Sequence, residues 1–296
     1  MAEKQRKNPL AKVILLRLAQ SLGKGGWALT STVLVFTTVV IIAAFLWQEY
    51  REELVNQSQF RLKAENLNLV TPQPKWIRSD VKQNAITRGR LHDALILDHD
   101  LGLRIQKSFL GSPWVKDVLM VNKSSARHSG INVRLAYREP VAMVIVPMSK
   151  YVPNSSEKWG LLPIDVEGFL LPDSDFDSDD ANSAYPKIAN IQSDPIGDGR
   201  FWGDQLVVDA AQIAKLLRDR WQRLGFRKLI APDSDSQRLF MIETHDGQEI
   251  IWGNPPKKEK ADEAQYSVKL ARLTEFSKLD KIPKNSLGQF DLRIIQ

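Results

Sequence analysis

The sequence predicts an α+β protein in which one N-terminal transmembrane helix precedes a region of alternating helical and strand patterns. Three observations predict this class. The stretch 27–47 contains no charged residue. Apolar residues recur at spacings of three and four in several later segments, which indicates amphipathic helices. Short runs of alternating apolar residues lie between them and indicate strands. We expect two helices on a small sheet first, and then a mostly antiparallel β domain with two helices.

The uncharged stretch 27–47 is long enough to cross a membrane. At about 1.5 Å per residue, a helix of this length covers a hydrocarbon core of about 30 Å. Trp27 and Trp47 lie at its two ends, where interfacial aromatic side chains are favoured. A cleaved signal peptide is disfavoured because the apolar stretch exceeds the usual roughly 7–15 residues and no small-x-small site follows it. We therefore expect an uncleaved signal anchor.

The charges on either side of this stretch predict its orientation. Residues 1–26 carry six basic side chains and one acid, a net charge of +5. Acidic side chains follow the stretch, beginning at Glu49. By the positive-inside rule, residues 1–26 form a cytoplasmic tail and the bulk of the chain is extracytoplasmic. We expect a single-pass, type II membrane protein whose mass is extracytoplasmic.

The whole chain has a net charge of +6, so the 270 residues after the basic tail carry only +1. A nucleic-acid-binding domain normally concentrates its positive charge on the folded surface. We therefore expect no nucleic-acid partner.

Residues 48–75 are polar and end in Thr71-Pro72-Gln73-Pro74. This composition is typical of a juxtamembrane linker that begins as a helical extension of the anchor and then stiffens. The block 76–147 follows. Its patterns predict helices over 79–90, with Ser79 or Asp80 as N-cap, and over 98–110, and then strands over 114–122 and 131–138.

From Val141 onward the pattern is mostly that of strands. The turn at His245-Asp246-Gly247 is a strong hairpin signal, because glycine accepts the positive φ that such a turn requires. Glu167-Gly168 predicts a second turn. The expected elements are strands over 141–146, 160–171 (a hairpin), 238–244, 249–252 and 290–295, and helices over 206–224 and 266–279.

The motifs of common enzyme sites are missing from the sequence. There is no cysteine, which excludes disulfides, thiolate catalysis and cysteine metal sites. The four histidines do not form the HExxH pattern, which would place two imidazoles on one helix face for zinc. No GxSxG elbow and no GxxxxGK[ST] phosphate loop is present. We expect no catalytic residue, no metal, no cofactor and no small-molecule substrate.

An acidic run is the polar cluster that stands out. Alternating carboxylates can converge on Ca²⁺, which takes six to eight oxygens. The EF-hand pattern fails, however, because Ser178 and Ala184 stand where it needs Gly and Glu. We expect a solvated loop between two strands. The run consists of Asp173, Asp175, Asp177, Asp179 and Asp180.

The order of three short motifs resembles the FtsQ/DivIB family of bacterial cell-division proteins. They are Pro113-Trp114-Val115, Arg138-Glu139-Pro140-Val141-Ala142 and Asp165-Val166-Glu167-Gly168. The stretches SQRLFMIETHDGQEIIWG, KLARLTEFSKL and DLR continue the resemblance, which spans residues 27 to 293 behind the signal anchor. Each motif is weak alone, and their order and spacing carry the similarity.

The resemblance implies a POTRA-like (polypeptide-transport-associated) βααββ module at 76–147 and an FtsQ/DivIB-like β domain at 148–296. It also implies a non-enzymatic scaffold of the divisome at the septum, in the cytoplasmic (inner) membrane with its mass in the periplasm. Such a scaffold recruits and couples membrane division proteins, with partners of the FtsB/DivIC and FtsL types. The motif residues identify the fold rather than a site, and we expect them to be structural: Trp114, Glu139, Pro140, Asp165 and Gly168.

We expect the last strand to be the partner-binding edge, because an exposed edge strand offers unpaired N–H and C=O groups to an added strand. Its expected partner-facing residues are Phe290, Leu292, Arg293, Ile294 and Ile295. Two alternatives remain open: a POTRA-bearing component of envelope transport or secretion, and an extracytoplasmic sensor module.

Overall fold

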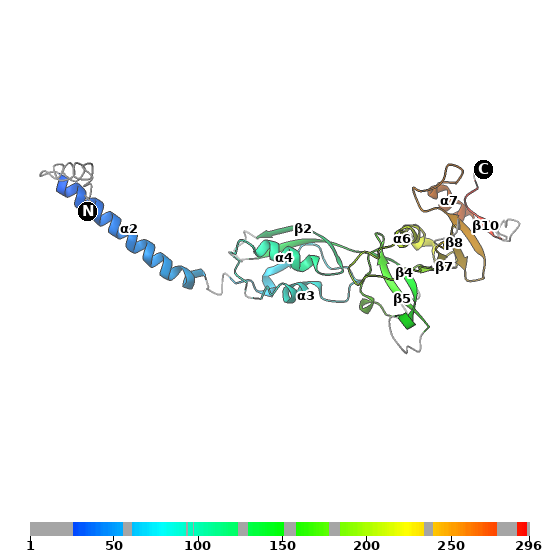
Figure 1. The fold of residues 1–296 in the computed structure, drawn as a ribbon, viewed down its shortest axis with the longest axis horizontal. Helices are drawn as coiled ribbons and strands as arrows, with labels where there is room; N and C mark the ends of the chain where they lie inside the picture. Colours follow the sequence, from blue (N-terminus) through cyan, green and yellow to red (C-terminus); the bar gives the residue numbers. More distant parts are fainter. Residues whose placement is uncertain are drawn as a thin grey trace, which may run out of the picture. The chain divides into compact units, whose positions relative to one another are not determined.

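The computed structural model describes residues 26–55, 61–92, 94–96, 98–123, 130–150, 158–177, 184–233, 239–276 and 289–294. The chain divides into two units, Met1–Arg61 and Leu62–Gln296, and Figure 1 shows the elements of each. The described residues confirm a mixed α+β protein with an apolar N-terminal helix.

The first unit contains one long helix, α2 (Gly26–Val55). Its segment Ser31–Tyr50 is long and apolar enough to cross a membrane. The hydroxyls of Thr37 and Thr38 donate hydrogen bonds to the carbonyls of Val33 and Leu34, at 2.7 and 2.8 Å, so these two polar side chains are satisfied within the helix. The basic tail that predicts the orientation lies outside the described residues except for Gly26.

The second unit begins with a three-stranded sheet and two helices. Its elements are β1 (Leu67–Leu69), α3 (Val81–Arg88), α4 (Leu101–Leu110), β2 (Val115–Lys123) and β3 (Ile131–Tyr137). The strand order is β1-β3-β2, in which β3 pairs parallel with β1 and antiparallel with β2.

Local sequence explains both helices. The Asp80 carboxylate accepts a hydrogen bond from the backbone N–H of Gln83 at 2.8 Å, so Asp80 is the N-cap of α3. The apolar residues of α4 that are spaced by four, Leu101, Ile105 and Phe109, are fully buried against the sheet. These two helices and strands β2 and β3 confirm the expected elements.

The residue pattern did not predict strand β1, and the first strand of the βααββ order that the resemblance implies was expected within 76–147. Strand β1 lies within 48–75, which the sequence assigns to a linker, yet Leu62 and Leu67 are buried in the core of this first sheet. The linker prediction is therefore wrong from Leu62 onward. The reason is that Leu67–Leu69 is too short to produce a pattern, and it becomes a strand only by pairing with Ile131–Val133.

A seven-stranded sheet forms the rest of the second unit, in the order β10-β9-β8-β7-β6-β4-β5. Its strands are β4 (Pro140–Pro147), β5 (Trp159–Asp165), β6 (Lys187–Ala189), β7 (Phe226–Ile230), β8 (Phe240–Thr244), β9 (Glu249–Gly253) and β10 (Phe290–Asp291). Two helices accompany it, α6 (Gln205–Leu217) and α7 (Tyr266–Phe276). Short 3₁₀ segments lie at Ala64–Asn66, Met148–Lys150, Asp173–Asp175 and Arg218–Arg220 (η2 to η5).

This sheet is mixed, which corrects the expectation of a mostly antiparallel domain. The pairs β10/β9, β7/β6 and β6/β4 are parallel, and the other three described pairs are antiparallel. Strands β6 and β7 were not expected at all. Strand β4 belongs to this sheet, so the first module ends near Glu139 rather than at residue 147.

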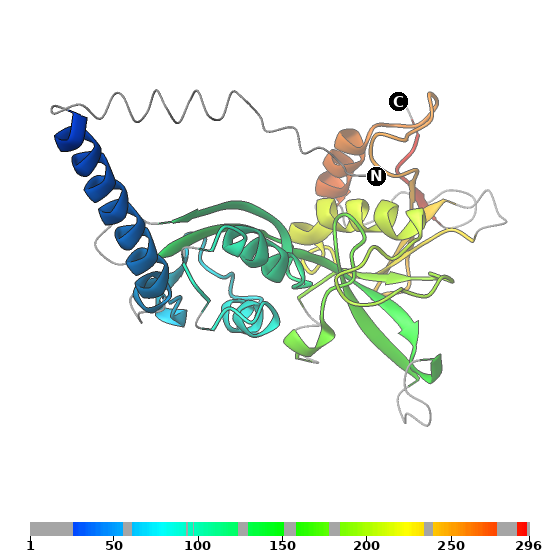
Figure 2. The same cartoon turned by 60° about the vertical axis from the view of Figure 1, so that its left-hand side comes forward.

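Both helices pack on the same face of the seven-stranded sheet, as Figure 2 shows for α6 and α7. Residues of that face, such as Val144, Ile188 and Leu229, share one apolar core with Ala210 of α6 and Leu273 of α7. The hairpin β8–β9 is confirmed, since it turns at His245-Asp246-Gly247 with Gly247 at a φ of 79°.

A buried ion pair connects the end of β3 to the turn after β5. The Arg138 guanidinium lies 2.5 Å from the Asp165 carboxylate, and both side chains are almost fully buried. The other carboxylate oxygen of Asp165 accepts the backbone N–H groups of Glu167 and Phe169, each at 2.9 Å. One carboxylate therefore fixes the turn and binds the residue at which the chain passes from the first sheet to the second.

The remaining motif residues surround this contact. Trp114 is buried, and its carbonyl accepts the N–H of Arg138 at 2.9 Å. Glu139 is exposed and pairs with Arg218, whose guanidinium also donates to the carbonyl of Pro140. Gly168 has a φ of 76°, and an added Cβ would lie 2.9 Å from the Val208 side chain, so the turn requires glycine.

We predict that Asp165→Asn destabilises the protein by about 3 kcal/mol, because it leaves the buried Arg138 charge without its main partner. Glu167→Gln is the matched control, since Glu167 is half-exposed and should cost less than about 1 kcal/mol. Urea unfolding of the full chain in detergent, followed by tryptophan fluorescence, measures both. Equal effects of the two substitutions would contradict a structural role for the buried pair.

Candidate functional site

The C-terminal strand β10 lies at one edge of the seven-stranded sheet. It pairs parallel with β9, with Asp291 opposite Ile251, and the N–H of Leu292 donates to the Ile251 carbonyl at 3.1 Å. In a parallel ladder alternate residues bond to the same neighbour. The backbone groups of Phe290 and Leu292 therefore face β9, and those of Asp291 and Arg293 point to the outer edge.

The outer edge is partly occupied by the chain itself. The N–H of Arg293 donates to the Asp291 carboxylate at 2.9 Å, and the carbonyl of Arg293 accepts the N–H of Ala264 at 2.9 Å. None of the hydrogen bonds among the described residues uses the outward N–H and C=O of Asp291. The edge therefore offers an added strand the N–H and C=O of Asp291, rather than a long ladder of backbone hydrogen bonds.

A side-chain ion pair between Asp291 and Arg293 reinforces this cap. The Arg293 guanidinium contacts the Asp291 carboxylate through Nε at 3.0 Å and Nη2 at 2.7 Å. Burial acts to raise the pKa of Asp291, but the hydrogen bonds from the Arg293 side chain and backbone outweigh it and hold that pKa below its ordinary value. Asp291 is therefore a carboxylate at neutral pH.

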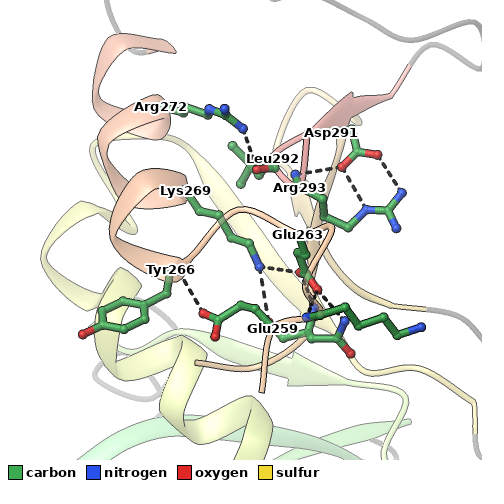
Figure 3. A network of polar contacts seen from close by, with 10 residues as sticks. Glu259, Glu263, Tyr266, Lys269, Arg272, Asp291, Leu292 and Arg293 are labelled. Atoms are coloured by element: carbon green, nitrogen blue, oxygen red, sulfur yellow. Dashed lines mark hydrogen bonds and ion pairs between the residues drawn. The ribbon is translucent and has the colours of Figure 1, made fainter. Parts of the chain in front are cut away.

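A buried lysine–glutamate pair holds the loop that caps β10 (Figure 3). The Lys269 ammonium of α7 lies 2.6 Å from the Glu263 carboxylate, and their side chains are only 0% and 4% exposed. Glu263 also accepts the backbone N–H of Asn254 at 2.7 Å. Because Glu263 precedes Ala264, the ion pair positions the N–H that binds the Arg293 carbonyl.

Gly253, at the end of β9, leaves room for the side chains of Glu263 and Arg293. Gly253 has a φ of 96°, and an added Cβ would lie 1.9 Å from a carboxylate oxygen of Glu263 and 2.8 Å from the Arg293 side chain. Only glycine leaves that space, so Gly253 is required for the close approach of Glu263 and Arg293. The Arg272 guanidinium completes the network by donating to the Leu292 carbonyl at 2.9 Å, as Figure 3 shows.

The structure separates the residues that the sequence predicts as the partner-facing set. Ile294 is 57% exposed, whereas Phe290 and Arg293 are half-buried. Leu292 is 0% exposed and belongs to the core, and its N–H bonds to β9, so this member of the expected edge lies on the inner side of β10. The alternation of a strand explains this, because Leu292 points to the face that the helices cover. Ile295 lies outside the described residues.

The described part of the acidic run is solvated only in part, since Asp173 and Asp177 are exposed and Asp175 is not. Asp175 is buried and accepts hydrogen bonds from the Ser79 hydroxyl at 2.8 Å and the Ser79 N–H at 3.3 Å. Asp177 forms an ion pair with Arg78. These carboxylates therefore bind the segment before α3, and no group of three or more potential metal ligands is found in the part of the chain that the structure describes. Asp179 and Asp180 lie outside it.

Sequence reasoning missed the Glu263–Lys269 pair and the cap by Ala264. The two charges are six residues apart and look like ordinary surface residues in the sequence. The available signal was Gly253 at the end of a strand, since a glycine there marks a close approach of another group.

Comparison of the chain with protein-family models and with curated proteins found no match. The resemblance to a family therefore rests on the sequence motifs alone and stays a prediction.

We predict that stability falls as the pH drops below about 4.5, the ordinary pKa of glutamate. Burial acts to raise the pKa of Glu263, but hydrogen bonds from Asn254 and Lys269 outweigh it and the pKa is lowered from 4.5. A lowered folded-state pKa gives stability that is present above the unfolded pKa and is lost as the pH falls through the folded one. Denaturant unfolding of the full chain at a series of pH values measures this loss.

The double variant Glu263→Gln, Lys269→Met removes both charges together, so that no buried charge is left alone. It should show a smaller loss of stability between pH 5 and low pH than the original chain. Glu275→Gln, on the exposed side of α7, is the control and should keep the original profile. An unchanged profile in the double variant would exclude Glu263 as the source of the pH dependence.

Proposed function

We propose that this chain is a non-enzymatic scaffold of the FtsQ/DivIB kind, anchored in the bacterial inner membrane by α2. It recruits and couples membrane division proteins at the septum. The observation that carries the proposal is the position of the last strand, β10, at the edge of the second sheet with the outward backbone groups of Asp291 available for strand addition.

The order of elements supports this function. The succession β1–α3–α4–β2–β3 is the βααββ order expected of a POTRA-like module, and a mixed sheet ending in an edge strand follows it. The apolar segment Ser31–Tyr50 precedes both. A membrane anchor, a small module and a terminal edge strand together suit a protein that binds other membrane proteins rather than a small substrate.

The expected partners are small coiled-coil division proteins of the FtsB/DivIC and FtsL types. A partner strand would pair with the outward N–H and C=O of Asp291 and lie beside the exposed side chain of Ile294. It would extend past Asp291 only by displacing the Ala264 N–H from Arg293. The cap therefore keeps the added strand short, and side-chain contacts must supply much of the affinity.

We predict that a fluorescent protein fused to the N-terminus, on the cytoplasmic side, forms a band at midcell before constriction begins. The reason is that a recruiting scaffold must reach the division site ahead of the proteins it couples. Fluorescence microscopy of dividing cells makes the measurement. Uniform membrane fluorescence, in cells that divide normally without the protein, would move the function to envelope transport or to sensing.

We predict that Asp291→Pro abolishes capture of the FtsB/DivIC-type partner, because proline removes the outward donor and leaves the Leu292 bond to β9 in place. Asp291→Ala is the matched control, since it removes the same carboxylate but keeps the N–H. Co-purification of the partner with each variant in detergent separates the two effects. If both variants capture equally, strand addition at Asp291 is excluded.

A further inference from the structure

The chain passes from the first sheet to the second between Tyr137, where β3 ends, and Pro140, where β4 begins. Two compact modules joined at one crossing move relative to each other unless a large apolar interface holds them. The Arg138–Asp165 pair lies at this crossing, so it can act as a pivot but does not by itself prevent rotation. A second attachment, away from the crossing, is needed to fix one sheet against the other.

Residues 171–177, which we call the strap, form such an attachment. The strap begins beside β5, where the N–H of Leu171 donates to the Pro163 carbonyl at 2.9 Å. The side chain of Leu171 is nevertheless fully buried in the core of the first sheet. The strap therefore starts on the backbone of one sheet and enters the core of the other.

Phe176, near the end of the strap, packs on both modules. Its ring centre lies 6.0 Å from that of Trp114, which belongs to the first core. On its other side the ring meets Tyr185 edge-on at 5.7 Å, and both rings pack on Met143 of β4. One aromatic side chain therefore joins the first core to the second sheet.

The first module also holds the middle of the strap by hydrogen bonds. The buried carboxylate of Asp175 accepts the Ser79 hydroxyl at 2.8 Å and the Ser79 N–H at 3.3 Å. Asp177 pairs with Arg78, but both side chains are exposed, so this pair adds little. Because a buried carboxylate without hydrogen bonds is costly, the Ser79 contact keeps the strap in place while Asp175 is buried.

A neighbouring loop touches the first module beside the strap. The N–H of Gly199 donates to the Leu170 carbonyl at 2.8 Å, next to the start of the strap. Gly199 has a φ of 71°, and an added Cβ would lie 2.9 Å from the Cα of Pro113. This close approach extends the interface between the modules beyond the strap itself.

We propose that the strap holds the two sheets together as one rigid body, and that its release frees a hinge at Arg138 and Glu139. With the strap in place, the edge strand β10 stays at a fixed distance from Leu62, the first residue of the second unit. With the strap released, the second sheet turns about the crossing while the strands of both sheets stay paired. This inference concerns motion within the second unit, so it holds whether or not β10 binds a partner.

Double electron–electron resonance on the full chain in nanodiscs tests the rigid body. The chain contains no cysteine, so spin labels can be attached at pairs of introduced cysteines. Arg134→Cys on β3 with Lys215→Cys on α6 reports between the sheets, and Lys215→Cys with His245→Cys reports within the second module; all three positions are exposed. The first pair should give a distance distribution as narrow as the second. A clearly broader distribution for the first pair would overturn the proposal.

Asp175→Ala removes the carboxylate that binds Ser79. It should broaden the distribution of the pair between the sheets and add a second distance, and leave the pair within the second module unchanged. Ser174→Ala, at the exposed neighbour in the same 3₁₀ turn, is the matched control and should change neither distribution. An Asp175→Ala distribution as narrow as the original one would exclude the hinge. If Asp175→Ala also disturbs the second pair, Phe176→Leu, which removes the ring contacts but keeps an apolar side chain, is judged by the same criterion.

Discussion

One-sided burial of the seven-stranded sheet is the constraint on which the rest of the second unit depends. Helices α6 and α7 share a single apolar core with one face, so every strand must send alternate residues to that face. This buries the Leu292 side chain. The backbone groups of its neighbours Asp291 and Arg293 point to the outer edge of the sheet.

Two buried ion pairs then fix the segments that pack against the sheet. A buried ion must be paired, and the partner can come only from a segment that folds over it. Glu263 and Lys269 bring the loop after β9 against the last strand, and this loop limits how long an added strand can be. Arg138 and Asp165 perform the same task where the chain passes between its two sheets.

Local patterns predicted the elements that have their own signal. Asp80 marked the start of α3, the four-residue spacing of Leu101 and Ile105 predicted the buried face of α4, and His245-Asp246-Gly247 predicted the β8–β9 turn. Three strands were missed, namely β1, β6 and β7. The first two have three residues each and pair parallel with distant strands, so no local alternation of apolar and polar residues predicts them.

The sequence by itself determined the apolar helix near the N-terminus, the α+β class and most helices and hairpins, because these depend on composition and on residues a few positions apart. It also indicated the last strand as an edge. Only the tertiary structure decided that Leu292 is buried and that Ala264 caps Arg293. These contacts join residues that are brought together by the order of the strands and the placement of the helices. Strand order and helix placement in turn depend on burying one face of the whole sheet.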